Sequence, residues 1–126
     1  MGRKFFLKCH LIFCIKYRKK ILDETFCKHL REIFNNIENK SDFKIDIFEF
    51  DKDHVHFLID YEPQISITSI VRKMKQESTI NIWKKESKIL SKYFWKEKTF
   101  WSDGYYVSSI GNASEETIKK YIEQQG

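Results

Sequence analysis

The sequence has few cysteines, one proline and no long apolar run. It contains three cysteines, Cys9, Cys14 and Cys27, which are odd in number and have no C-x-x-C spacing. This pattern argues against a disulfide framework or a cysteine zinc site, so we expect reduced thiols in a cytoplasmic protein. No apolar run is long enough to cross a membrane, and no secretory signal begins at Met1. With one proline, Pro63, and no repeats, we expect no internal linker.

Aromatic and basic residues are abundant by contrast. A chain of 126 residues is enough for one compact domain, which we expect to cover residues 1–126. Aromatic residues make up 16% of it, including 11 phenylalanines, so it can bury a sizeable core. Its formal net charge is +5. Basic charge with many aromatics fits nucleic-acid binding, although many basic proteins bind none.

Apolar periodicity predicts an α+β fold. Alternating residues predict strands, and apolar residues three or four apart predict helices. The expected strands cover residues 4–17, 43–50, 55–60 and 105–110. The expected helices cover residues 23–39, a stretch from 66, a further stretch near 79–88, and a last one beginning near 112–114. This order is that of a ferredoxin-like βαββαβ sheet with helices on one face, plus a C-terminal helix.

Further expectations concern the sheet and its assembly. The run Ile47-Phe48 interrupts the alternation of the second strand and indicates a bulge, and residues 51–53 predict a hairpin turn before the third strand. We expect the first and third strands to be central. A four-stranded sheet leaves edges that need cover, and the long first strand offers a partner surface, so we also predict a homodimer.

His54 and His56 alternate onto one face of the third strand. They lie roughly 6–7 Å apart, so two imidazoles could lean onto one metal ion. A bare His-x-His is nonetheless more often a half-exposed pair with no ligand. Asp60 shares the face but lies roughly 13 Å from His56, so a third ligand must come from elsewhere. We expect His10, on the mixed face of the first strand, to be a surface histidine.

Two basic stretches could contact phosphates. The first, at residues 16–20, follows a strand, although a charge run is usually only a solvated turn. The second lies off the apolar stripe of the helix that begins near residue 66. The predicted DNA-binding residues are Lys16, Arg18, Lys19, Lys20, Arg72, Lys73 and Lys75. A third stretch, residues 84–98, mixes six lysines with three adjacent aromatics, which suits either base stacking or core packing.

The last predicted helix places Tyr121 and Gln125 one turn apart on one side. If that side meets the histidine strand, Gln125 could give an amide oxygen to the metal. A tyrosine hydroxyl has a pKa of about 10 and is a poor nucleophile alone, but a metal that polarises a phosphate would help it. A tyrosine on an apolar stripe is usually core, and the spacing alone does not decide between these interpretations.

Several motifs occur in order along nearly the whole chain. They are His10-Leu11-Ile12-Phe13 with Lys16-Tyr17-Arg18, then His54-Val55-His56, then Trp101-Ser102-Asp103-Gly104-Tyr105-Tyr106-Val107-Ser108-Ser109-Ile110-Gly111, and finally Tyr121-Ile122-Glu123-Gln124-Gln125. The histidine motif alone is weak, but the set is specific. The chain thus resembles the small single-tyrosine HUH transposases of bacterial insertion sequences, the IS200/IS605 group.

The resemblance implies a chemistry and a substrate. It implies that His54, His56 and Gln125 hold Mg²⁺ or Mn²⁺. Tyr121 would attack a DNA phosphodiester and keep a 5′-phosphotyrosine link, and strand transfer would reverse that attack. The implied substrate is single-stranded DNA with hairpins near the element ends, with no small molecule or membrane as partner. The implied assembly is a homodimer in which one subunit's tyrosine helix commonly completes the other's site.

Three alternatives stay open at this point. One is a ferredoxin-like nucleic-acid-binding module without chemistry. Another is a domesticated relative that processes repeated hairpins, and the third is a replication-initiation HUH nuclease. Many relatives continue beyond the tyrosine helix, whereas this sequence ends at Gly126. That departure bears on whether the site is completed in cis or in trans.

Overall fold

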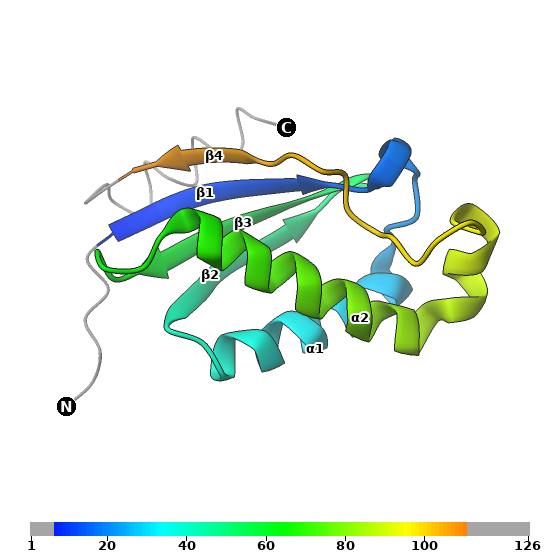
Figure 1. Cartoon of the computed structure of the whole chain (residues 1–126), viewed down its shortest axis with the longest axis horizontal. Helices are drawn as coiled ribbons and strands as arrows, with labels where there is room; N and C mark the ends of the chain where they lie inside the picture. Colours follow the sequence, from blue (N-terminus) through cyan, green and yellow to red (C-terminus); the bar gives the residue numbers. More distant parts are fainter. Residues whose placement is uncertain (1–6, 111–126) are drawn as a thin grey trace.

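The computed structural model describes residues 7–110, which form a four-stranded antiparallel sheet covered on one face by two helices (Figure 1). The elements are β1 (Leu7–Cys14), the 3₁₀ turn η1 (Lys16–Arg18), α1 (Glu24–Asn39), β2 (Phe43–Phe50), β3 (His54–Tyr61), α2 (Ile67–Tyr93) and β4 (Tyr106–Ser109). The strand order is β2-β3-β1-β4. The first and third strands are therefore central, as predicted.

Strand alternation places one fully apolar face against the helices. Six inward residues of β1 and β3 are fully buried: Cys9, Leu11, Phe13, Val55, Phe57 and Ile59. The Phe57 ring lies 5.0 Å from that of Phe13 and 4.9 Å from that of Phe34 on α1. Fully burying such a side chain contributes about 1.5–3 kcal/mol, so these contacts fix the sheet against α1.

Both helices begin where the sequence predicts. The Asp23 carboxylate accepts a hydrogen bond from the Phe26 backbone N–H at 2.8 Å, and the Ser66 hydroxyl accepts one from Ser69 at 3.1 Å. Such caps contribute about 1 kcal/mol each. The prediction of two separate stretches after residue 66 is wrong in detail. A single helix, α2, covers both, and its backbone departs from helical geometry at Glu86 (φ −126°, ψ 29°), whose carboxylate pairs with His29 on α1 at 3.0 Å.

The first strand ends earlier than predicted. It also lies in the middle of the sheet, so the prediction that it offers a surface to a partner subunit is wrong. Within the described residues β1 ends at Cys14, and η1 follows it. Strand β1 pairs with β3 on one side and, over Cys9–Ile12, with β4 on the other. The two edge strands are β2 and the four-residue β4. The bulge lies at Asp46, between Ile45 and Ile47, one residue before the predicted run.

The two ends of the sheet differ in what lies there. His54 pairs with Cys14 at one end, beside η1. At the other end the Ile110 backbone N–H donates to the Lys8 carbonyl at 2.8 Å, so the described chain leaves the sheet far from His54. Between residues 7 and 110 no helix is long and apolar enough to span a bilayer.

Candidate metal-binding site and basic turn

Three histidines gather on the sheet face opposite α1 and α2. His10 Nε2 lies 3.2 Å from His56 Nδ1, and their rings are stacked with centroids 5.4 Å apart. The His54 and His56 ring centroids are 4.8 Å apart. His10 is fully buried, so the prediction of a surface histidine is wrong. Burial arises because β1 is central and because the Tyr106 ring of β4 packs edge-on against His10 at 6.0 Å.

Asp53, in the turn before β3, orients His54. One carboxylate oxygen lies 2.8 Å from His54 Nδ1, and the other accepts a hydrogen bond from Arg18 Nε at 3.1 Å. The hydrogen bond with His54, and then the one with Arg18, lower the pKa of Asp53. An ionised carboxylate at this position favours the tautomer in which Nδ1 of His54 carries the proton and Nε2 has the lone pair. A carboxylate behind an imidazole is the arrangement that orients metal-binding histidines.

The surroundings of His10 and His56 favour the neutral form of both rings. Burial, and then the neighbouring His56, lower the pKa of His10 to about 4. Burial, and then His54, lower the pKa of His56. The neutral imidazole is the form that coordinates metals. Because His56 Nδ1 is engaged with His10, Nε2 is the His56 nitrogen that is available to a metal.

The described residues fit a metal but do not complete its coordination. No group of three or more His, Cys, Asp or Glu side chains that could hold an ion occurs within residues 7–110. Two neutral imidazoles on one strand face suit Mn²⁺ better than Mg²⁺, which prefers oxygen ligands. A third His, Cys, Asp or Glu ligand would therefore have to come from outside this range. The predicted ligand Gln125 and the predicted nucleophile Tyr121 both lie outside the described residues.

The basic turn, residues 16–20, adjoins His54 through Arg18 and Asp53. Tyr17 and Arg18 have positive φ values of 60° and 53°, which cost non-glycine residues about 1–2 kcal/mol each. The Arg18 ion pair to Asp53 and a hydrogen bond from the Arg18 N–H to the Ile15 carbonyl at 2.8 Å hold this conformation. The structure thus brings Lys16, Arg18, Lys19 and Lys20 together at the histidine end of the sheet.

Comparison with known proteins identifies the family. The family model described as "Transposase IS200 like" matches residues 3–125. The chain belongs to this transposase family. It is 28% identical over 124 residues to the ISDra2 transposase TnpA of Deinococcus radiodurans, covering 98% of this chain and 87% of that one. It is 26% identical over 118 residues to the transposase for insertion sequence element IS200 of Salmonella typhimurium, covering 94% and 76%.

Solved structures agree with this assignment. A crystal structure of a candidate transposase from Deinococcus radiodurans R1 superposes with a TM-score of 0.76 at 26% identity, covering 99% of this chain and 95% of that one. A REP-associated tyrosine transposase bound to a REP hairpin has a TM-score of 0.64, with 98% and 67% coverage. At 14% identity the second likeness shows a shared fold.

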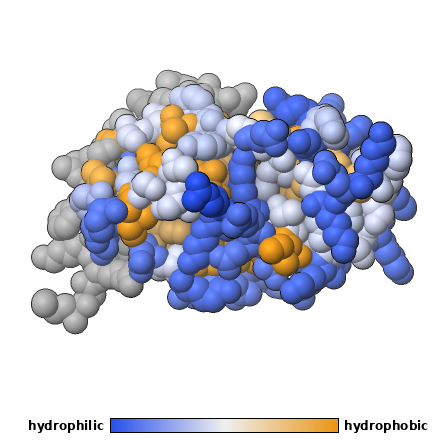
Figure 2. Space-filling model, viewed as in Figure 1, coloured by the Kyte–Doolittle hydropathy of each residue, from blue (hydrophilic) through white to orange (hydrophobic). Residues whose placement is uncertain are grey.

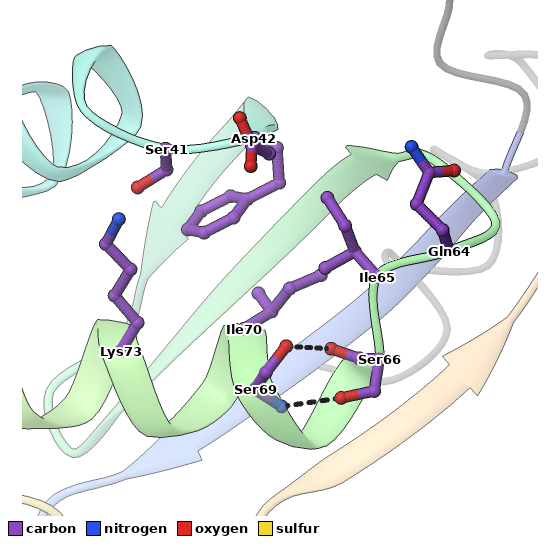
Figure 3. A pocket seen from close by; sticks show the side chains of 9 residues that line it. Ser41, Asp42, Gln64, Ile65, Ser66, Ser69, Ile70 and Lys73 are labelled. Carbon is purple, nitrogen blue, oxygen red and sulfur yellow. Dashed lines mark hydrogen bonds between the residues drawn. The ribbon is translucent and has the colours of Figure 1, made fainter.

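The predicted DNA-binding residues on α2 of this IS200-like transposase do not all face the histidines. Lys73 Nζ donates to the Lys40 carbonyl at 3.0 Å. Lys73 also lines a pocket of about 410 Å³ near Ser66, Ser69 and Gln64, which follows the far end of β3 (Figure 3). No His or Cys lines that pocket. Arg72 is exposed on α2.

Lys75 points instead toward the loop before β4. Its ammonium donates to the carbonyls of Ser102 at 2.8 Å, Asp103 at 3.3 Å and Gly104 at 2.7 Å. Burial lowers the pKa of Lys75. A phosphate contact by Lys75 would compete with these three hydrogen bonds. Their evident effect is to fix the loop that leads into β4 of the transposase.

A charged cluster that the sequence analysis missed lies on the same sheet face, at the end away from His54. Lys8 Nζ is 2.6 Å from Asp60 and 3.2 Å from Asp46. Burial, and then the hydrogen bond with Asp46, raise the pKa of Asp60 to about 6. Burial opposes the ionisation of Asp46, but hydrogen bonds with Asp60 and Lys8 lower its pKa overall. The alternation that places Asp60 on this face also holds for Lys8, and the two residues pair across the sheet.

Proposed function

We propose that this transposase cleaves and rejoins single-stranded DNA with a divalent metal ion and a tyrosine nucleophile. The observation that supports it most is the His54–His56 pair, with His54 oriented by Asp53 and a basic turn beside it, in a member of a transposase family. The strand order and the helices on one sheet face match a ferredoxin-like plan. In this proposal the C-terminal helix carries Tyr121.

The proposed reaction exchanges one phosphate ester bond for another, so the energy of the broken bond is kept in the new one. The Tyr121 hydroxyl oxygen forms a bond to a DNA phosphorus and gives up its proton, while the bond from that phosphorus to the 3′ oxygen breaks. The leaving 3′ oxygen takes up a proton and becomes a 3′ hydroxyl. The product is a 5′-phosphotyrosine ester. Attack on that ester by a 3′ hydroxyl reverses the step and joins strands, so no external energy source is needed. Mg²⁺ or Mn²⁺ held by His54, His56 and Gln125 would polarise the phosphate.

The proposed substrate is single-stranded DNA with hairpins at the ends of an insertion element. A structural neighbour is described as bound to a REP hairpin, which supports this substrate class. Lys16, Arg18, Lys19 and Lys20 would contact phosphates near the cleavage site, since they lie at the end of the sheet where His54 begins. Contacts of this kind release counterions, so binding should weaken steeply with salt.

We also propose a homodimer. Within residues 7–110 the sheet edges are β2 and β4 rather than β1, and a second subunit could pair with such an edge. In such an assembly the helix with Tyr121 could serve its own subunit or the partner.

Tyr121→Phe tests the chemistry directly. The wild type, incubated with Mn²⁺ and labelled single-stranded DNA from the flanks of its own gene, should form an adduct that survives denaturation. Tyr121→Phe should bind the same DNA and form no adduct, because only the attacking oxygen is removed. Tyr105→Phe, a change of the same size in an exposed ring, is the matched control and should still form it. An adduct with Tyr121→Phe would show that another residue is the nucleophile.

A further inference from the structure

The two most exposed large hydrophobic side chains of the described residues lie at one pocket. Trp95 is 75% exposed and Tyr17 is 71% exposed. They are far apart in sequence, yet both line a pocket of about 250 Å³, together with Tyr93, Phe94, Lys96, Glu97 and Thr99. Its two walls are η1 and the segment after α2, which lie toward the same side of the molecule (Figure 1). We call it the Tyr17–Trp95 pocket.

Cations lie over both exposed rings. The Lys16 ammonium is 5.7 Å from the Tyr17 ring centroid, and the Lys96 ammonium is 5.0 Å from that of Trp95. Lys19 and Lys20 are exposed next to Tyr17. In Figure 2 the side of the molecule where η1 and the segment after α2 lie is largely hydrophilic. The site therefore combines flat aromatic surfaces with positive charge, and Glu97 is the one acidic residue among the seven that line it.

The pocket is built on anchored backbone. Tyr17 and Arg18 hold the left-handed conformation, and the ion pair from Arg18 to Asp53 fastens this wall to the start of β3. The opposite wall is fixed by Phe94, which is buried and whose N–H donates to the Leu90 carbonyl at 2.8 Å. The backbone that carries these rings is thus fixed before a ligand arrives, which lowers the entropic cost of binding.

We propose that the Tyr17–Trp95 pocket binds an unpaired base of the single-stranded DNA substrate, stacked on Trp95 and Tyr17, while the lysines contact the adjoining phosphates. This inference rests on the proposed function and names a contact for its substrate. Stacking on aromatic rings beside cations is how proteins hold single strands, and it tolerates any base because every base has a π face. A volume near 250 Å³ is below the range of about 300–1,000 Å³ for drug-sized ligands and suits one planar ring system.

The position of the pocket also suits this role. Asp53 contacts Arg18 with one oxygen and His54 with the other. A base held at Tyr17 would therefore lie at the end of the sheet where the proposed metal ligands begin. A strand anchored there would have its next phosphates close to the basic turn.

The test separates stacking from phosphate binding. Fluorescein-labelled (dT)₁₂ and a 12-mer of abasic residues carry the same backbone charge, but only the first has bases. By fluorescence anisotropy, the wild type should bind (dT)₁₂ about 5- to 100-fold more tightly than the abasic strand. Trp95→Ala should remove most of that difference, and Trp95→Phe should restore part of it. Ile80→Ala, which truncates an exposed apolar side chain elsewhere on α2, should leave both affinities unchanged.

Tryptophan fluorescence gives a second readout. Trp83 and Trp101 are buried, so unlabelled (dT)₁₂ should quench the emission of Trp95 and the abasic strand should not. Equal wild-type affinity for the two strands, or a base preference that survives in Trp95→Ala, would overturn the proposal. In that event, adduct formation by the wild type would show that the proposed function stands without this pocket. A wild type that binds neither strand and forms no adduct would overturn both.

Discussion

Replacing Asp53 with alanine tests whether His54 is a metal ligand. The Asp53 carboxylate lies 2.8 Å from His54 Nδ1 and is held in turn by Arg18 at 3.1 Å. Without this carboxylate the His54 ring can rotate and its tautomer is no longer favoured. Nε2 then becomes a weaker ligand for the metal. Loss of such a partner lowers metal affinity about 10- to 100-fold, which corresponds to about 1.4–2.8 kcal/mol. We expect Asp53→Ala to lose Mn²⁺ affinity within this range.

The assay is calorimetric titration of Mn²⁺ into the wild type, Asp53→Ala and His56→Ala. Asp51→Ala is the matched control, because it removes the same charge two residues away, where the carboxylate accepts a hydrogen bond from the Lys52 N–H. Asp51→Ala should bind Mn²⁺ nearly as well as the wild type, and His56→Ala should bind it least well. If Asp53→Ala and Asp51→Ala bound Mn²⁺ equally, the carboxylate would not orient a ligand. If His56→Ala matched the wild type, the proposed site would be wrong.

Two further predictions concern stability. The folded-state pKa of Asp60, about 6, is above its ordinary value of 3.8, so its stabilising effect is full below pH 4 and is lost as pH rises through 6. This loss is about 1–2 kcal/mol after allowance for Asp46 and for solvent screening. Lys8→Met removes the cation that lowers the pKa of Asp60. The free energy of unfolding in urea should therefore fall more between pH 5 and pH 8 in Lys8→Met than in the wild type. Equal falls would show that Lys8 does not act on Asp60. Lys75→Met should lower the free energy of unfolding by about 1–3 kcal/mol, because three carbonyls lose their hydrogen-bond donor. Lys73→Met removes only one such hydrogen bond, so it should lower the free energy of unfolding by less. A larger loss for Lys73→Met than for Lys75→Met would refute this account.

Local patterns were enough to predict the sheet and the facing of its residues. The alternation of His54 and Val55 sets which side chains face the helices, because a strand has a period of two. The caps at Asp23 and Ser66 were equally predictable, since each acts on an N–H three residues away. These features depend on neighbours in sequence, which is why periodicity and spacing capture them.

Features that depend on distant pairing were missed. His10 is buried because β3 and β4 flank β1, and that order is not written in the local pattern of the first strand. Lys75 looked like a free cation off the apolar stripe, but its long side chain reaches carbonyls 27–29 residues away. The pairing of Lys8 with Asp46 depends on a bulge that was placed one residue too late. The first two misses come from tertiary contacts, and the third comes from the misplaced bulge.

The position of Ile110, where the described chain leaves the sheet, sets the distance that separates it from the histidines. The last hydrogen bond, from Ile110 to Lys8, is four residues of β1 from Ile12, which pairs with His56. That separation is about 13 Å. The fifteen residues from 111 to 125 would measure about 22 Å as a helix and up to about 50 Å fully extended. A chain of this length is therefore long enough for Gln125 to reach the histidines of its own subunit.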